Sequence, residues 1–192
     1  PRYEYLYGQT LSQLEALCNR LEMPRFAAKQ IARWLYDKHA TTIEAMSDLS
    51  VRHRALLAET YEVGFTSPEK VSISADGTKK YLYRTSQNHF IESAYIPDGD
   101  RATLCISSQA GCRMGCRFCA STQAGRVRNL EAGEICSEIY TTQKDIGERI
   151  SHIVLMGIGE PLDNFDEVMR FLENITSPEG VNIGMRNISL ST

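Results

Sequence analysis

Apolar residues recur every three or four positions in the first third of the chain. Between residues 11 and 21 they form one stripe behind Thr10 and Gln13, a pair that suits a capping box, and Pro24 interrupts the pattern. The same spacing predicts two further helices, at about 25–38 and about 51–60. Residues 1–66 are therefore expected to form a small helical module.

From about residue 67 the apolar period changes from helical to alternating, which predicts strands. The alternation places Glu92 on one face with Phe90, Ala94 and Ile96, so that a carboxylate lies on an otherwise apolar surface. Such a carboxylate has either an acid–base role, often with a raised pKa, or the role of an inward-pointing charge that protects a sheet edge. The predicted strands are 70–74 and 80–83, which flank an Asp76-Gly77 turn as a hairpin, and 90–96 and 102–107.

Beyond residue 130 helices and strands alternate. A helix at about 130–145, capped by Asn129, is followed by a buried strand at 151–156. A second helix, capped by Asn164 with Glu167, then precedes a strand at 188–192. This order predicts a parallel sheet with helices outside it, and ligands of such sheets collect at the carboxyl ends of the strands. The fold class is therefore α/β.

Composition narrows the class of protein. The chain has 192 residues, of which 42% are hydrophobic, and a net charge of −3, values typical of a globular protein. It contains neither an apolar run of bilayer length nor a basic-then-apolar leader, so we expect a cytoplasmic protein with no membrane partner. In that reducing compartment six cysteines favour metal binding or catalysis over structural disulfides.

Positive charge concentrates in one segment. No acidic residue occurs between residues 101 and 130. A segment of this kind suits the phosphates of a nucleic acid, and the alternative is a solvated loop whose cations pair with acids elsewhere. The cations are Arg101, Arg113, Arg117, Arg126 and Arg128.

The same segment carries the strongest chemical motif. Cys112, Cys116 and Cys119 offer three thiolates within eight residues and no fourth ligand beside them. Three ligands leave one metal position open, as in a cubane iron–sulfur cluster, whereas a structural zinc site is normally closed by four. The alternative is a zinc site that Cys105, Cys136 or His152 completes.

The spacing Cys-x-x-x-Cys-x-x-Cys, with an aromatic residue before its last cysteine, resembles the signature of the radical S-adenosylmethionine (SAM) superfamily. The resemblance implies that the three cysteines hold a [4Fe–4S] cluster whose open iron binds SAM. The turn Gly159-Glu160-Pro161 resembles the GEP-type motif of the superfamily, which implies that Gly159 and Glu160 contribute to SAM binding. A carboxylate suits this role because the SAM ammonium needs acceptors.

Longer sequence segments at 101–109, 125–130 and 156–162 resemble the RlmN/Cfr family, and their residues favour its RlmN branch. Members methylate carbon 2 (RlmN) or carbon 8 (Cfr) of an adenosine in 23S ribosomal RNA, and RlmN also modifies tRNA. The resemblance therefore implies 23S rRNA and tRNA as partners, together with an electron donor of the flavodoxin or ferredoxin type. It also implies the domain plan: a helical RNA-binding-like module at 1–66, a hairpin connector at 67–100, and the first part of a radical SAM (β/α) partial TIM barrel at 101–192.

The resemblance implies further site residues. In that family a cysteine near the C-terminus carries the methyl group, which reaches the adenine ring as a carbon radical. By position, Glu92 matches the proton acceptor, Cys105 matches the cysteine that releases the product by disulfide formation, and Ser191 matches a SAM-contacting serine. Because the chain ends at Thr192, before any methyl-carrying cysteine, we expect no turnover by this chain alone. The rival functions are C8 methylation, another radical SAM reaction, and a non-catalytic zinc-bearing RNA-binding module.

Overall fold

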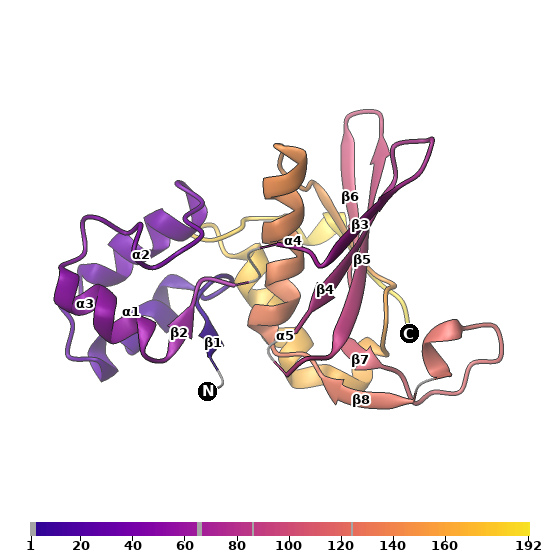
Figure 1. Ribbon diagram of the computed structural model, residues 1–192, viewed down its shortest axis with the longest axis horizontal. Coiled ribbons are helices and arrows are strands. Elements are labelled where there is room, and N and C mark those ends of the chain that lie inside the picture. Colours follow the sequence, from indigo (N-terminus) through magenta and orange to yellow (C-terminus); the bar gives the residue numbers. More distant parts are fainter. Residues whose placement is uncertain (1–2, 65–66, 86, 124) are drawn as a thin grey trace.

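The computed structural model describes residues 3–64, 67–85, 87–123 and 125–192, whose arrangement is shown in Figure 1. A group of helices lies at one end of the molecule and a six-stranded sheet lies at the other, with helices α4 (Ala132–Ile146) and α5 (Phe165–Thr176) between them. The predicted α/β class is confirmed. None of the helices in the described part is long and apolar enough to cross a bilayer.

Helix α1 (Leu11–Arg20) begins at the predicted capping box. Gln13 N–H donates to Thr10 Oγ1 at 3.2 Å and Thr10 N–H donates to Gln13 Oε1 at 3.0 Å, which satisfies two N–H groups that have no partner within the helix. The other predicted helices of this part are α2 (Ala27–Tyr36) and α3 (Val51–Ala58). A short parallel pair, β1 (Glu4–Tyr5) and β2 (Tyr61–Glu62), was not predicted.

The six-stranded sheet has the order β10-β9-β6-β5-β4-β3. Strands β6, β9 and β10 are parallel, and one α-helix lies in each described connection between them, as predicted. Strands β5, β4 and β3 continue the sheet in antiparallel pairing, so the predicted hairpin extends the barrel-like part. The strands are β3 (Lys70–Ile73), β4 (Lys79–Arg84), β5 (Phe90–Asp98), β6 (Arg101–Cys105), β9 (His152–Leu155) and β10 (Ile188–Leu190).

The two faces of the sheet differ in what they contact. On one face Tyr81 and Tyr83 are fully buried, and the Tyr81 hydroxyl donates to Asp145 of α4 at 2.6 Å. Residues of β5 that alternate with the buried ones, among them Glu92 and Ala94, lie on the opposite face and are partly exposed. We call this second face, which points away from α4, the open face.

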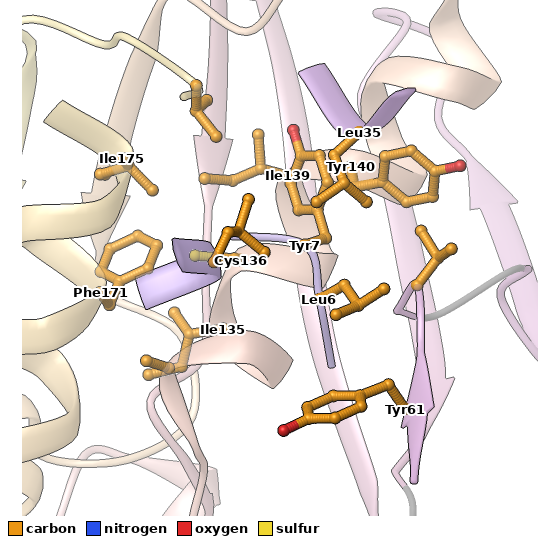
Figure 2. Close-up of a cluster of buried hydrophobic side chains, with 14 of the residues drawn as sticks. Leu6, Tyr7, Leu35, Tyr61, Ile135, Cys136, Ile139, Tyr140, Phe171 and Ile175 are labelled. Carbon is orange, nitrogen blue, oxygen red and sulfur yellow. The ribbon is translucent and has the colours of Figure 1, made fainter. Parts of the chain in front are cut away.

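The hydrophobic core cluster joins the N-terminal segment to α4 and α5, as Figure 2 shows. Leu6 and Tyr7 are buried in it, and the Tyr7 and Tyr140 ring centroids are 4.7 Å apart. At the next position, Gly8, a Cβ would lie 2.4 Å from Cys136 Sγ, so only glycine allows this close approach. The helical N-terminal part is therefore packed against the sheet-bearing part through a shared core.

One predicted helix cap is wrong, and the other is right in position but makes no capping hydrogen bond. Helix α4 begins after Glu131, because Asn129 is still part of the short strand β8 (Arg126–Asn129). Asn164 does precede α5, but its side chain makes no capping bond and instead donates to two backbone carbonyls, at 2.8 and 2.9 Å, on either side of the cysteine loop. Glu167 accepts the backbone N–H of Ala132 at 2.7 Å. Both side chains thus connect α5 to neighbouring segments.

Candidate cofactor and catalytic site

The motif cysteines lie on one loop that a two-stranded sheet closes. Strands β7 (Gln109–Gly111) and β8 pair in antiparallel fashion on the two sides of the loop. Glycine is required at position 111, where φ is +75° and a Cβ would lie 2.0 Å from the Gly125 carbonyl oxygen. The three thiols differ in exposure: Cys112 is buried, Cys119 is partly exposed and Cys116 is exposed.

The donor set of this loop fits a polynuclear cluster. Within the part of the chain that the structure describes, no three His, Cys, Asp or Glu side chains gather closely enough for one metal ion. In a cubane cluster each thiolate binds a different iron, so three thiols need not converge on one point. Gly115, with φ +71°, turns the chain between the first two cysteines, and Cys119 N–H donates to Cys116 O at 3.1 Å. These turns spread soft sulfur ligands along one short loop.

The Gly-Glu-Pro turn is hydrogen-bonded to strand β7. The backbone N–H groups of Ser108 and Gln109 both donate to the Ile158 carbonyl, and Glu160 N–H donates to Gln109 Oε1 at 2.8 Å. Gly159 has φ +108°, and a Cβ there would lie 2.6 Å from the Gln109 Cβ. The cysteine loop and the turn therefore meet beyond the carboxyl ends of β6 and β9, the place expected for a ligand in a parallel sheet.

Two other residues expected to contact SAM lie at this end of the sheet. The Glu160 carboxylate is partly exposed, and one of its oxygens accepts the Leu162 N–H at 3.0 Å. Ser191 directly follows β10 and is exposed. Since β10 is the parallel neighbour of β9, both positions follow strands whose carboxyl ends lie side by side.

Asp163 connects the cysteine loop to the turn, although no motif or spacing in the sequence singles it out. Its carboxylate accepts a hydrogen bond from Gln109 Nε2 at 3.0 Å and forms an ion pair with Arg113 of the loop. The Gln109 hydrogen bond, followed by the Arg113 interactions, lowers the pKa of Asp163 below its ordinary value. A fixed negative charge thus holds the side chain that follows the first cysteine.

Glu92 and Cys105 share the open face of the sheet. Ala94 of β5 pairs with Cys105 of β6, and Glu92 precedes Ala94 by two residues, so the three side chains point to the same side. Glu92 belongs to an interior strand, so edge protection does not account for its charge. Its Oε2 lies 3.0 Å from Nζ of Lys80, a partner that sequence analysis missed. The face around Glu92 is consequently charged as well as apolar.

The thiol of Cys105 is partly buried. This burial raises the pKa of the Cys105 thiol, the Met156 N–H opposes the rise, and the nearby Glu138 adds to it. A raised pKa keeps the group in the neutral thiol form near neutral pH, which makes it a poor nucleophile until a base removes its proton.

Ser107 joins the three segments that carry the site. Its Oγ donates to the Glu92 carbonyl and accepts the Ile158 N–H at 3.0 Å, and its own N–H donates to Glu138 Oε1 at 3.0 Å. Both Ser107 and Glu138 are fully buried. Burial raises the pKa of Glu138 well above its ordinary value. Neither residue is conspicuous in the sequence, because their importance depends on contacts between distant segments.

The other candidates for a zinc site lie away from the loop. Cys136 is fully buried in the core cluster of Figure 2, and burial strongly raises the pKa of its thiol. His152 begins β9, and its Nδ1 lies 2.8 Å from the hydroxyl of Ser151, the residue before the strand. Of the arginines, Arg128 is bound by both carboxylate oxygens of Glu134, at 2.8 and 2.7 Å. For Arg128, as for Arg113, the alternative to phosphate binding, that the arginine pairs with an acidic residue elsewhere in the chain, is confirmed.

Similar proteins were found by sequence and by structure. Residues 5–63 match the family described as "Ribosomal RNA large subunit methyltransferase N-terminal domain". The "Probable dual-specificity RNA methyltransferase RlmN" of Bacteroides thetaiotaomicron is 48% identical over 97% of this chain and 54% of that protein. The protein of the same description from Lachnoclostridium phytofermentans is 45% identical over 95% of this chain and 52% of its own length.

A crystal structure of a radical SAM methyltransferase from Sphaerobacter thermophilus superposes with a TM-score of 0.91 at 36% identity, covering 98% of this chain and 56% of that chain. The chain is similar to RlmN proteins over nearly its whole length. The resemblance found in the sequence is confirmed, and so is the expected fold, a helical N-terminal part followed by radical SAM barrel strands with an extra hairpin. The chain spans about half the length of the RlmN relatives that it matches.

Proposed function

We propose that this chain supplies the cofactor-binding part of a radical SAM enzyme that methylates carbon 2 of adenosine in 23S rRNA and tRNA. One observation carries the proposal: the cysteine loop is bonded to the Gly-Glu-Pro turn beside a sheet face that presents Glu92 and Cys105. RNA as the substrate class comes from the description of the relatives as dual-specificity RNA methyltransferases, whereas 23S rRNA, tRNA and carbon 2 come from the family resemblance of the sequence. We also keep a cytoplasmic location as a prediction, since a thiol-held cluster suits a reducing compartment.

The cofactors fit the residues that are present. Cys112, Cys116 and Cys119 would hold a [4Fe–4S] cluster, and Gly159, Glu160 and Ser191 would hold SAM. When bound, this pair supplies one-electron cleavage of a carbon–sulfur bond and donates a methyl group, chemistry that side chains alone do not provide. The backbone at Gly159 can approach a ligand closely because no Cβ is present, and the Glu160 carboxylate is an acceptor for an ammonium.

The protein residues would then handle protons and thiol exchange. The Glu92 carboxylate would accept the proton that leaves adenine carbon 2, as the family resemblance implies. Cys105 would release the methylated RNA by attacking the sulfur of the methyl-carrying cysteine expected in the longer relatives, so that the sulfur–carbon bond to the RNA breaks as the disulfide forms. Because the pKa of Cys105 is raised, its thiol stays protonated before this step and is protected from premature oxidation.

Metal content tests the cofactor part of the proposal in this chain. Anaerobic reconstitution should give a brown protein with about four irons per chain and a spectrum that changes on adding SAM. Replacing Cys112 by serine should abolish the colour, whereas Cys18→Ser, at a buried cysteine of α1, should keep it. A colourless protein with stoichiometric zinc would instead support the rival zinc-bearing RNA-binding module.

The reaction is tested in a chimaera in which this chain precedes the remaining part of the Bacteroides thetaiotaomicron relative. With a flavodoxin- or ferredoxin-type reductant, the chimaera should place a methyl group on carbon 2 of adenosine in rRNA and tRNA, while the 192-residue chain alone should transfer none. Methylation at carbon 8 would assign the site to the rival C8 reaction. A different SAM-derived product without any methylated RNA would assign it to another radical SAM reaction. In the chimaera, Cys105→Ala should trap RNA bound covalently to protein.

A further inference from the structure

Two lysines on one strand have ion pairs on opposite faces of the sheet. Lys79 Nζ lies 2.9 Å from Asp145 of α4, on the covered face. Lys80 Nζ lies 3.0 Å from Glu92 Oε2, on the open face. Lys80 pairs with Ala94 and Glu92 pairs with Leu82 across β4 and β5, so the two charged residues are diagonal neighbours, a spacing that a long side chain can bridge.

The Lys80–Glu92 pair does little for folding. The two side chains are 58% and 40% exposed, and ion pairs between such exposed groups add little to stability. Its position is nevertheless specific. Lys80, Ala94 and Cys105 form one row across three strands, and Glu92 lies two residues from that row toward the carboxyl end of β6. The pair therefore borders the surface between Cys105 and the Gly-Glu-Pro turn.

We propose that Lys80 is a positioning residue that aims the Glu92 carboxylate at the adenine bound over the open face; the inference rests on the proposed function. The proton transfer follows addition of the methyl-derived carbon to adenine carbon 2: the carbon–hydrogen bond of that tetrahedral carbon breaks, the proton goes to a Glu92 oxygen and the bonding pair stays in the ring of the covalent adduct. Lys80 loses no proton in this step. A carboxylate on a free side chain samples several rotamers, whereas one held at 3.0 Å by an ammonium keeps fewer of them.

RNA bound over the open face would strengthen this effect, because displacing water increases the attraction between the two charges. The competing role for an exposed lysine beside RNA is binding of a backbone phosphate. The two roles are distinguishable. A phosphate contact contributes to RNA affinity, whereas a positioning contact contributes to the rate once RNA is bound.

The first test measures the pair in this chain without cofactors. In protein labelled with 13C at glutamate carboxyl carbons, Lys80→Met should shift the Glu92 signal at neutral pH, and Lys79→Met should leave it in place. Lys80→Arg, which retains a cation, should shift it less than Lys80→Met. A Glu92 signal that is the same with and without Lys80 would overturn the proposal.

The second test uses the chimaera under single-turnover conditions. Lys80→Met should lower the rate of RNA methylation on the order of tenfold at saturating RNA, with KM for RNA unchanged, and Lys80→Arg should recover most of the loss. Lys79→Met should stay within about twofold of the unsubstituted chimaera. A rise in KM alone would assign Lys80 to phosphate binding and contradict the inference. If the unsubstituted chimaera does not methylate RNA, the proposed function fails, and the carboxyl signal alone decides whether Lys80 holds Glu92.

Discussion

Replacement of Gly159 by alanine tests whether the turn and the cysteine loop act as one cofactor site. Gly159 has φ +108°, which an alanine rarely adopts. An added Cβ would lie 2.6 Å from the Gln109 Cβ and 2.8 Å from the Gln109 backbone nitrogen, distances that non-bonded atoms do not tolerate. The nearest obstacles are backbone or next to it, so they cannot simply rotate away.

The magnitude follows from these two terms. The unfavourable dihedral costs about 1–3 kcal/mol, and overpacking adds roughly 1–3 kcal/mol. The chain can relieve this cost by moving the turn away from β7, which breaks the Glu160–Gln109 hydrogen bond. A loss of about 3 kcal/mol from the free energy of SAM binding corresponds to roughly a hundredfold weaker affinity.

The assay is a spectroscopic titration of the iron-reconstituted chain with SAM. Gly147→Ala is the matched control, because Gly147 also has a positive φ, +71°, but its added Cβ would meet no atom within 4 Å. Gly147 ends α4, away from the turn, so this variant should lose about 1 kcal/mol of stability and keep its SAM affinity. Wild-type SAM affinity in the Gly159→Ala protein would show that the turn does not hold this ligand.

Three further changes have defined outcomes. The folded protein holds the Glu138 proton more tightly than the unfolded chain does, because burial raises the pKa of Glu138. The stability that Glu138 contributes is therefore complete below the ordinary pKa of 4.5 and declines as the pH rises toward the raised pKa. Glu138→Gln should remove this decline in thermal melts between pH 5 and 9. Asp163→Asn should speed amide hydrogen exchange at residues 109–113, because it removes the charge that binds Arg113. Thr10→Ala should cost about 1 kcal/mol of unfolding free energy, measured by urea denaturation, because it opens the capping box. Each expectation is contradicted by a value equal to that of the wild-type protein: the pH slope of stability for Glu138→Gln, the exchange rates for Asp163→Asn, or the urea midpoint for Thr10→Ala.

Local pattern was sufficient for the main helices, for the strands of the six-stranded sheet and for the cysteine loop. The helix behind Thr10, the hairpin at Asp76-Gly77 and the parallel connections all follow from spacing and turn residues within a few positions. The cysteine spacing is also a local signal. Prediction failed where a polar side chain had two possible partners: Asn164 has the sequence of a cap, yet it bonds to segments that fold next to it from far along the chain.

The contacts that fix the site could not be read from the sequence for the same reason. The partners of Ser107 come from β5, α4 and the Gly-Glu-Pro turn, which are separated by 15 to 51 residues along the chain. Lys80 and Glu92 are two charges among many until strand register places them side by side. Sequence periodicity shows on which face of the sheet a residue lies, but the register between paired strands decides which residues are its neighbours.

Most residues that hold the candidate site together are not those expected to touch a ligand. Ser107 bonds the Glu92 strand to the turn, Gln109 bonds the turn to the cysteine loop, and Asp163 holds both Gln109 and Arg113. These bonds are already formed in the protein alone, so the cost of ordering the loop and the turn is met during folding and does not subtract from ligand affinity. Substitutions at these three positions should therefore weaken SAM binding even where every residue expected to contact SAM is intact. Normal SAM binding by the Ser107→Ala and Gln109→Ala proteins would show instead that the ligand itself orders the site.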